Sequence, residues 1–355
     1  MKKILFFLQS GVGGAERVTV TIAKYLNTTK FDVKFCIVDR PLGNTTIDVF
    51  IPERYPKIRI PNIRGFKQVY ALYCVLRREK PDIVFSSIMH TNTKLLALSF
   101  LFRKTKFIVR NNNYLYTLSR FQKLVLKFTY KCADIIVAQT DEMKKELVRE
   151  VGIRCDKIKV LQNPIDVDTI NVMQKQKSPY NNNGNVRFVA SGRFVPAKGF
   201  DILLKAFSIV REKMPHSELF IVGNTDGSCS GYYESIRNLS RELNVVDSVH
   251  FVGFQHNPYV FVKNADCFVL SSRNEGLPNV LIESLYLGTP VAATKCIPVI
   301  SRIVEDGVNG FVAEPENAES LALAMLNAVC LGRVSSSYQS ADENEFAKLF
   351  ERGDE

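Results

Sequence analysis

The sequence lacks long apolar runs, closely spaced cysteine pairs and any abundance of histidine, and each absence excludes a class of protein. Its longest internal apolar stretch, residues 95–102, is interrupted by Ser99 and falls far short of the roughly 20 residues that span a bilayer. The eight cysteines include no CxxC pair and no histidine at metal-ligand spacing, which argues against a zinc site or a disulfide framework. We therefore expect a protein of a reducing compartment without a membrane-spanning segment.

The N-terminus, MKKILFFLQSG, shares one feature with secretory signal peptides, because two lysines precede an apolar run. That run extends only from Ile4 to Leu8, and no small-residue cleavage site follows it. We therefore interpret this segment as a first β-strand and expect a cytoplasmic protein.

The composition is that of a folded, two-domain chain with an uneven charge. Its 355 residues exceed what one small core needs, and 46% hydrophobic with 23% charged residues excludes wholesale disorder. Residues 1–160 carry 30 basic and 13 acidic side chains, a balance of +17, while residues 161–355 carry 17 and 23, a balance of −6. The basic first half indicates a polyanionic partner, either nucleic acid or an anionic membrane surface.

Short apolar runs alternate with amphipathic segments of helical length in both halves of the chain. This rhythm predicts βα units and parallel sheets, hence an α/β fold of two doubly wound, Rossmann-like domains. Ligands bind beyond the carboxyl ends of parallel strands, so two such sheets facing each other would form a cleft. The predicted division is a first domain at 1–165, a polar linker at 166–185, a second domain at 186–330, and a final helix or frayed tail at 331–355.

A glycine-rich turn, SGVGGAER, follows the first expected strand and precedes a helix that begins near Ala15. Gly13 and Gly14 would let backbone N–H groups approach an anion at the N-terminus of that helix. The spacing is not GxGxxG, because Glu16 occupies the place of the third glycine, so a nicotinamide dinucleotide site is disfavoured. A phosphate-facing loop and a tight turn without a ligand both remain open.

Two cations lie in GRFVPAKGFD, directly after the strand expected at residues 188–191. Arg193 and Lys198 could clamp a diphosphate, the arginine through a forked hydrogen bond and the lysine as a point charge. The alternative is an ordinary solvated loop, since exposed lysine and arginine are common.

The most specific signal is RNEGLPNVLIESLYLGTP, in which Glu275 lies on a loop and Glu283 lies two turns into the following helix. Eight helical residues separate the carboxylates by roughly 12 Å, which suits the two ends of one elongated ligand rather than a shared proton. One carboxylate could bind a ribose and the other a sugar ring. The backbone N–H groups that would face phosphate at the helix start are those of Asn279, Val280 and Leu281.

Taken together, these motifs and the late turn DGVNGF resemble those of retaining glycosyltransferases of family 4, which have the GT-B fold. The similarity covers residues 3–330 and is greatest to bacterial members that build capsule, O-antigen or lipid-linked oligosaccharides from nucleotide sugars. The resemblance implies that the first domain binds the acceptor and the second binds the donor. The set of motifs is specific, although each motif alone is weak.

The resemblance also implies roles for individual residues. Glu283 would hold the ribose of the nucleotide, and Glu275 would contact the donor sugar. Arg193 and Lys198 would stabilise the departing diphosphate in place of a metal ion, so no metal cofactor is expected. Gly13 and Gly14 would belong to the loop that closes over the site from the first domain.

The chain departs from the family at one position. Many members have a histidine after the strand expected at residues 107–109, whereas this sequence has RNNNY, with Asn112 as the nearest match. Asparagine donates hydrogen bonds but carries no proton between substrates, so the identity of the base stays open. His90 is a candidate for binding the acceptor, although an ordinary loop histidine is as compatible with the sequence. Glu16 and Asn92 are weaker candidates at the same edge of the sheet.

Residues 114–131, YLYTLSRFQKLVLKFTYK, combine four cations with bulky apolar side chains on a predicted helix. Such a basic amphipathic helix suits an anionic lipid surface. The alternative is that its apolar side packs on the sheet while the lysines meet water. We favour a peripheral protein on the inner face of the cell membrane, because polyprenyl-linked acceptors reside in the bilayer.

The predicted function is transfer of a sugar, with retention of configuration, from a nucleotide-sugar donor, most simply a UDP-sugar, to a lipid-linked saccharide in surface polysaccharide synthesis. One alternative is a UDP-sugar epimerase of the same two-domain fold, although the first domain offers few acid/base groups for it. A nucleic-acid-binding protein is disfavoured, because lysines and aromatic residues form no stacking platform and no such signature is present.

Overall fold

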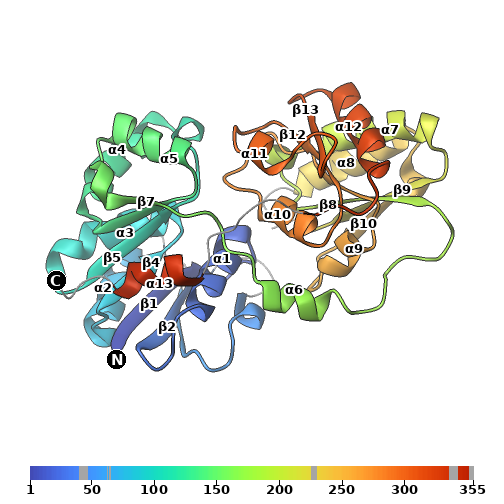
Figure 1. Ribbon diagram of the computed structural model, residues 1–355. Coiled ribbons are helices and arrows are strands. Elements are labelled where there is room, and N and C mark those ends of the chain that lie inside the picture. The colour runs from blue at the N-terminus through green and yellow to red at the C-terminus, as the bar shows by residue number, and fades with distance from the viewer. Residues whose placement is uncertain (40–46, 62, 64, 225–229, 336–342, 352–355) are drawn as a thin grey trace. The chain divides into compact units, whose positions relative to one another are not determined.

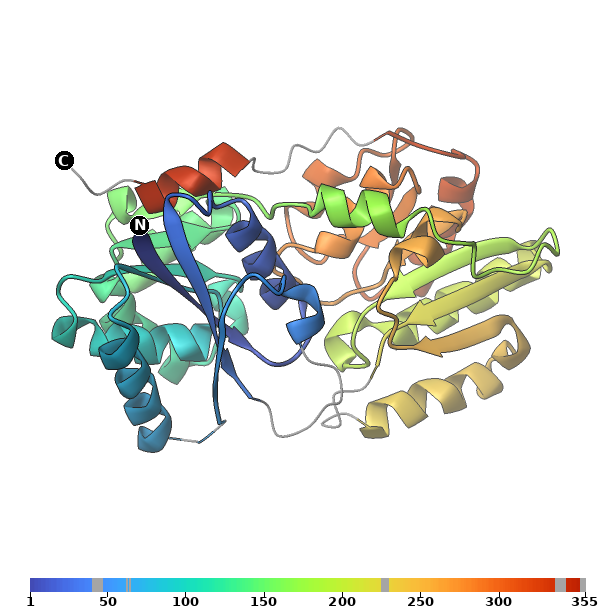
Figure 2. The same cartoon turned by 90° about the horizontal axis from the view of Figure 1, so that it is seen from below.

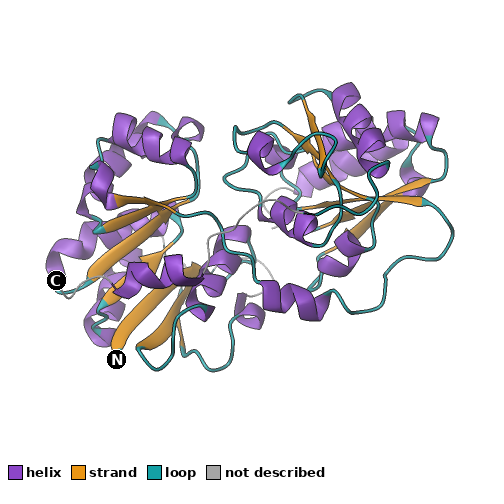
Figure 3. Cartoon of the chain, viewed as in Figure 1, coloured by secondary structure: helices purple, strands orange, loops and turns teal. Residues whose placement is uncertain are grey.

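The computed structural model describes residues 1–39, 47–61, 63, 65–224, 230–335 and 343–351. The chain divides into two compact units (Figure 1): Met1–Pro164 with Ser340–Glu355, and Ile165–Gln339. Each unit is a parallel sheet flanked by helices (Figure 3). The predicted α/β class, with two doubly wound domains, is confirmed.

In its described residues the first unit has a seven-stranded, all-parallel sheet in the order β3-β2-β1-β4-β5-β6-β7. Chain order reverses between β1 and β4, so the carboxyl ends of these neighbouring strands form the switch point at which doubly wound folds bind ligands. The strands are β1 (Lys2–Gln9), β2 (Phe31–Val38), β3 (Lys57–Ile60), β4 (Ile83–Ser86), β5 (Lys106–Asn111), β6 (Ile135–Ala138) and β7 (Ile158–Val160).

Two helices of the first unit, α4 and α5, begin at a side-chain cap that the sequence supplies. Ser119 and Gln122 form a reciprocal capping box at the start of α4, and Thr140 caps α5 by accepting from the N–H of Met143. The helices are α1 (Gly14–Lys24), α2 (Phe66–Glu79), α3 (Met89–Leu98), α4 (Arg120–Thr129) and α5 (Asp141–Glu146), with short turns η1 (Ile47–Phe50), η2 (Ser99–Leu101), η3 (Leu115–Thr117), η4 (Tyr130–Cys132), η5 (Leu147–Val151) and η6 (Cys155–Lys157).

The C-terminal helix α13 (Glu343–Glu351) packs into the core of the first unit (Figures 1 and 2). Phe350 is fully buried, with its ring 5.7 Å from that of Phe6 on β1 and 5.8 Å from that of Phe85 on β4. Lys106 donates to the carbonyl of Leu349 at 2.9 Å. For residues 331–355 the sequence predicts either a final helix or a frayed tail. The described residues 343–351 form a helix that belongs to the first unit.

In its described residues the second unit has a six-stranded parallel sheet in the order β10-β9-β8-β11-β12-β13. Its strands are β8 (Val186–Ser191), β9 (Ser217–Val222), β10 (Val249–Gly253), β11 (Cys267–Leu270), β12 (Val291–Thr294) and β13 (Gly310–Ala313). Its helices are α6 (Val167–Met173), α7 (Phe200–Lys213), α8 (Ser230–Glu242), α9 (Tyr259–Lys263), α10 (Asn279–Tyr286), α11 (Ile300–Ile303) and α12 (Ala318–Val329), with turns η7 (Pro196–Lys198) and η8 (Val246–Ser248).

The segment 166–185, expected as a linker, contains helix α6 and is part of the second unit. The Asp166 side chain caps α6 by accepting from the N–H of Thr169, and Tyr286 on α10 donates to Asn171 at 3.1 Å. Across the described residues, no helix combines the length and apolar character needed to cross a bilayer.

Candidate active site

The structure brings Lys198 and Glu275 together at the carboxyl ends of β8 and β11. Lys198 ends the short turn η7, and its Nζ lies 2.6 Å from Oε1 of Glu275. Ser272 donates to the same carboxylate oxygen at 2.7 Å. The Lys198 and Glu275 side chains are only 21% and 12% exposed, so solvent screens this ion pair less than one on the open surface.

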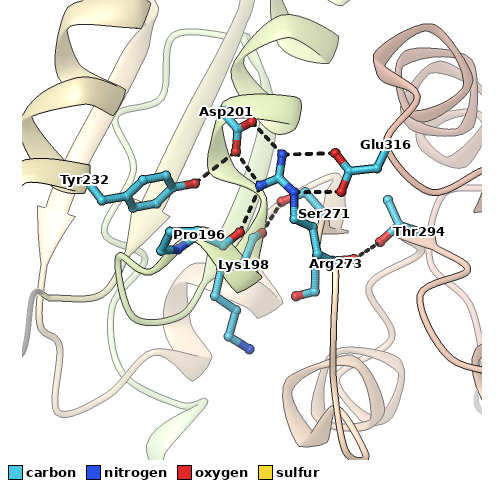
Figure 4. A network of polar contacts seen from close by, with 9 residues as sticks. Pro196, Lys198, Asp201, Tyr232, Ser271, Arg273, Thr294 and Glu316 are labelled. Atoms are coloured by element: carbon cyan, nitrogen blue, oxygen red, sulfur yellow. Dashed lines mark hydrogen bonds and ion pairs between the residues drawn. The ribbon is translucent and has the colours of Figure 1, made fainter. Parts of the chain in front are cut away.

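Arg273, two residues before Glu275, ties the two loops to each other (Figure 4). Its guanidinium makes a forked pair with Asp201 on α7, at 2.8 and 2.7 Å, and an ion pair with Glu316 at 2.6 Å. It also donates to the carbonyl of Pro196, while its backbone N–H donates to the carbonyl of Ala197. The turn that carries Lys198 is thereby fixed to the loop that carries Glu275.

A glycine permits the close approach of these loops. Gly199 has φ of +62°, in the left-handed region, and a Cβ atom there would collide with the backbone carbonyl of Ser271. The Ser271 hydroxyl donates to the carbonyl of Lys198 at 2.9 Å, and Thr294 donates to the carbonyl of Ser272 at 2.6 Å. The backbone on both sides of the ion pair is therefore held by hydrogen bonds.

The surroundings of the pair shift several pKa values. Hydrogen bonding from Arg273 holds the pKa of Asp201 below its usual range, so this carboxylate stays ionised at neutral pH. Burial, reinforced by Asp201, raises the pKa of Tyr232 to about 12, which keeps its hydroxyl a donor to Asp201 at 3.0 Å. Burial raises the pKa of the Cys296 thiol to about 12, and the nearby charge of Glu275 adds to the shift. A neutral thiol beside Glu275 is a poor nucleophile.

The other residues predicted for the donor half lie on the same edge of the second unit. Arg193 follows β8 in the loop that leads to Lys198, and its side chain is exposed. Glu283 lies on α10 and is half-buried. Asn279 and Val280 are the first two residues of that helix, whereas the N–H of Leu281 donates to the carbonyl of Pro278 at 3.1 Å.

The glycine-rich turn caps α1 in the first unit. Gly13 is the N-cap of α1, and a Cβ atom there would lie 2.5 Å from a carboxylate oxygen of Glu16. Glu16 is 6% exposed in the first turn of the helix, where a carboxylate favours the positive end of the helix dipole. A side chain at position 13 would therefore require the Glu16 carboxylate to shift.

His90, Asn92 and Asn112 all take part in hydrogen bonds within the first unit. The His90 ring is hydrogen-bonded to Gln9 at the end of β1. Asn92 is fully buried and donates to the carbonyl of Arg110 and the hydroxyl of Tyr130, each at 3.1 Å. Asn112 is half-buried, and its side-chain N–H donates to the carbonyl of Ser87.

Sequence reasoning did not single out Arg273, Ser272 or Arg110. Arg273 and Ser272 precede Glu275 within the same motif, so their position next to a predicted carboxylate was the available signal. Arg110 is the second-last residue of the buried strand β5, where a charged residue in an apolar run is unusual. Many family members have a histidine where this chain has Asn112. The residue that makes the main side-chain contacts at this place is Arg110, two positions earlier.

Two family models match successive parts of the chain. The model for "Glycosyltransferase Family 4" matches residues 12–169, and that for "Glycosyl transferases group 1" matches residues 172–340. The chain belongs to glycosyltransferase family 4. It is therefore a transferase, and the epimerase alternative is set aside; its two-domain α/β architecture is the GT-B fold.

Relatives of this family 4 enzyme include bacterial polysaccharide and lipopolysaccharide glycosyltransferases. An uncharacterized glycosyltransferase of Methanocaldococcus jannaschii is 33% identical over 65% of the chain and 59% of the relative. The N-acetylgalactosamine-N,N'-diacetylbacillosaminyl-diphospho-undecaprenol 4-alpha-N-acetylgalactosaminyltransferase of Campylobacter jejuni is 25% identical over 99% of this chain and 96% of the relative. The structure of Anabaena HepE in complex with UDP and glucose superposes with a TM-score of 0.81, at 21% identity over 99% and 98% of the chains, and so shares the fold.

Proposed function

We propose that this family 4 enzyme transfers a sugar from a UDP-linked donor to a lipid-linked saccharide, with retention of anomeric configuration, in bacterial surface polysaccharide synthesis. The observation that carries the proposal is the Lys198–Glu275 pair, held at 2.6 Å at the carboxyl ends of β8 and β11. A cation and a carboxylate side by side can serve the two parts of a nucleotide sugar, its diphosphate and its sugar hydroxyls. Relatives whose names specify a diphospho-undecaprenol acceptor support the acceptor class.

The reaction breaks the bond between the anomeric carbon and the diphosphate oxygen, and the electron pair leaves with the diphosphate. Negative charge therefore grows where Lys198 and Arg193 present cations from one loop. Preorganised cations stabilise such charge because they need no reorganisation during the step. Glu275 would accept hydrogen bonds from the sugar, and Glu283 would accept them from the ribose.

Metal independence is part of the proposal. In the described part of the chain, no three His, Cys, Asp or Glu side chains gather as a candidate metal site. The two cations of the loop after β8 would supply the charge that a divalent ion supplies in other transferases. Full activity after prolonged treatment with EDTA is the expected outcome, and loss of activity that is restored by Mg²⁺ or Mn²⁺ would contradict it.

Helix α4 supports docking of the first unit on an anionic membrane. Phe121 and Phe128 are 73% and 71% exposed, and Leu124 lies on the same side of the helix and is half exposed. The alternative, in which the apolar side packs on the protein, holds for Leu126, which is fully buried, but not for these three exposed side chains. Arg120 and the neighbouring lysines would attract anionic lipid while the aromatic rings enter the interface.

The decisive experiment supplies the enzyme with a labelled donor and a source of lipid-linked acceptor. Incubation of the enzyme with a radiolabelled UDP-sugar and bacterial lipid extract should move label into the lipid phase. Interconversion of free nucleotide sugars without lipid labelling would indicate an epimerase and overturn the proposal. A screen of nucleotide sugars by thermal shift identifies the donor first, because a ligand at 100 times its Kd adds about 2.7 kcal/mol of stability.

A further inference from the structure

The two side chains that donate to the Glu275 carboxylate meet at a single oxygen. Nζ of Lys198 lies 2.6 Å from Oε1, and the Ser272 hydroxyl donates to that same atom at 2.7 Å. These two donors occupy both lone pairs of Oε1. The other oxygen, Oε2, accepts no hydrogen bond from the described residues and keeps contact with solvent. Oε2 is therefore the atom of Glu275 that is open to a ligand.

Lys198 also retains hydrogen-bonding capacity. Among the described residues, only Glu275 accepts a hydrogen bond from its Nζ, and an ammonium has more N–H donors than this one bond uses. The stem of Lys198 lies over Gly192, where an added Cβ atom would come within 3.2 Å of Cε. The pair thus offers a ligand two kinds of group side by side: N–H donors that suit phosphate oxygens, and one carboxylate oxygen that suits a hydroxyl.

Ser272 is the more firmly held of the two donors. It is 2% exposed, and its carbonyl accepts from the hydroxyl of Thr294, which is 1% exposed, at 2.6 Å. The next N–H along the chain, that of Arg273, donates to a carbonyl of turn η7 at 2.8 Å. Lys198 instead reaches Glu275 with a long, flexible side chain that loses rotamer freedom in the pair. A ligand can therefore draw Lys198 away more easily than it can displace Ser272.

Binding of a diphosphate changes the demands on Lys198. The ammonium then turns part of its donor capacity from the carboxylate to the phosphate oxygens. With no second donor, the Glu275 carboxylate would follow the ammonium or turn toward solvent, because a charged group that loses its partner is costly to keep half-buried. The Ser272 hydroxyl is the contact that still holds Oε1. Oε2 then keeps its direction while the donor is bound.

We propose that Ser272 is a positioning residue for the donor sugar: by holding Oε1 of Glu275, it aims Oε2 at one hydroxyl or N–H group of that sugar. This inference rests on the proposed function, since it takes Glu275 to meet the sugar of the nucleotide donor. Ser272 is too buried to touch the ligand and acts through Glu275. A carboxylate oxygen only accepts, so a sugar that lacks a donor at this position leaves Oε2 unpaired and is disfavoured.

The test compares UDP with a UDP-sugar, because only the second carries the group that Oε2 would meet. The probe is whichever of UDP-glucose, UDP-galactose, UDP-N-acetylglucosamine and UDP-N-acetylgalactosamine binds the wild type most tightly in calorimetry. Ser272→Ala should raise the Kd of that UDP-sugar about tenfold, because a charge-assisted hydrogen bond is no longer aimed at the sugar. The Kd of UDP should stay within about twofold of the wild-type value, because UDP has no sugar beyond its diphosphate.

Two further variants show whether the effect is exerted through Glu275. In an enzyme that already carries Glu275→Ala, Ser272→Ala should change the Kd of the UDP-sugar by less than about twofold, since the group that Ser272 holds is gone. Ser240→Ala is the matched control. Ser240 on α8 is fully buried, and its hydroxyl donates to the carbonyl of Arg237 at 2.7 Å. This control should change neither Kd.

The outcomes separate this inference from the proposed function. An unchanged Kd of the UDP-sugar in Ser272→Ala would overturn the inference alone, as would an equal rise in the Kd of UDP, which would make Ser272 a structural residue. Should Ser272→Ala fail to fold, Ser272→Cys, whose S–H is only a weak donor, replaces it with the same expectations. A wild type that binds none of these UDP-sugars would overturn the proposed function, and this inference with it.

Discussion

Two arginines at the carboxyl edges of the two sheets, Arg273 in the second unit and Arg110 in the first, differ in how their charge is matched. In the second unit, Arg273 is matched by the carboxylates of Asp201 and Glu316, and Lys198 is matched by Glu275. In the described part of the first unit, Arg110 has amide partners and no carboxylate. The loops after β8 and β11 are thus held by a neutralised arginine–carboxylate network, whereas Arg110 keeps its positive charge at the carboxyl edge of the first unit's sheet.

The two units also differ in the number of aromatic side chains that they expose. Among the described residues, six aromatic side chains of the first unit are strongly exposed, against a single borderline case, Tyr286, in the second. An exposed aromatic side chain on a monomer indicates an interaction surface when others accompany it. The six are Phe66, Tyr70, Phe100, Tyr116, Phe121 and Phe128. The basic half of the sequence is thus also the half with exposed rings, which agrees with the membrane docking proposed for α4.

The largest effect should come from the ion pair that we place at the reacting bond. Lys198→Ala should lower kcat about a hundredfold or more, because it removes a charge that acts on the departing diphosphate. The melting temperature should fall by only a few degrees, because Glu275 loses its cation while Arg273 and Gly199 still hold the loop. Lys205→Ala, at an exposed lysine on the adjoining α7, serves as the control. Kinetics of sugar transfer, measured with saturating donor, check the prediction.

A Lys198→Ala enzyme with near-normal kcat and reduced stability would break the comparison, because the second unit's ion pair would then be structural. The double variant Lys198→Ala with Glu275→Gln makes this test sharper. The effects of residues that act as one unit do not add, so kcat of the double variant should be only a little lower than that of the less active single variant.

Much of this fold was predictable from the sequence because short apolar runs, regularly separated by amphipathic segments, determine it. The strands expected at Ile4–Leu8, 107–109 and 188–191 are present, with ends that differ by at most a few residues. The strands that the sequence did not predict, β3, β7 and β13, are three or four residues long and lie at or beside sheet edges. Such strands form because a neighbouring strand offers hydrogen bonds, and a local sequence pattern carries little trace of that.

Part of the candidate site was also predictable from the sequence. A loop motif identified Lys198 and Glu275, which the structure brings into contact across 77 positions of the sequence. Arg273 and Arg110 were not identified, because their importance arises from partners that are distant in sequence, such as Asp201 and Asn163. A single sequence shows which residues are charged, but only the fold shows which charges are paired.

An intermediate effect is expected from the exposed rings of α4. Replacing Phe121 and Phe128 together by serine should lower partitioning onto vesicles of anionic phospholipid about tenfold or more, because two large apolar side chains no longer enter the interface. Substitution of Val172 and Leu323, exposed apolar residues of the second unit, is the matched control. Flotation of protein with vesicles measures the partitioning.

Salt dependence separates the two contributions to membrane binding. High salt should weaken binding of the wild type only in part, since the charge of Arg120 and Lys127 is screened whereas ring insertion is not. Complete release of the wild type by high salt, with no effect of the serine variant, would show that charge alone holds the first unit on the membrane.

The smallest effect concerns the neutralised arginine–carboxylate network of the second unit and its dependence on pH. Arg273 holds the pKa of Asp201 below its ordinary value of 3.8, so the folded state favours the ionised carboxylate. The resulting stability is fully present above that ordinary value and is lost as pH falls below it through the folded-state pKa. Asp201→Asn should lower stability at pH 7 by about 1–2 kcal/mol, which corresponds to a few degrees of melting temperature.

The pH profile provides the check. The difference in melting temperature between wild type and Asp201→Asn should stay constant from pH 7 to pH 5 and should shrink as the pH is lowered further, because the wild-type carboxylate then takes up a proton. Asp156→Asn, which removes the exposed partner of Arg154, should leave the melting temperature unchanged throughout. A difference for Asp201 that persists at the lowest pH would show that its shape and hydrogen bonds, rather than its charge, stabilise the network, and the contrast between paired and unpaired charge in the two units would lose this support.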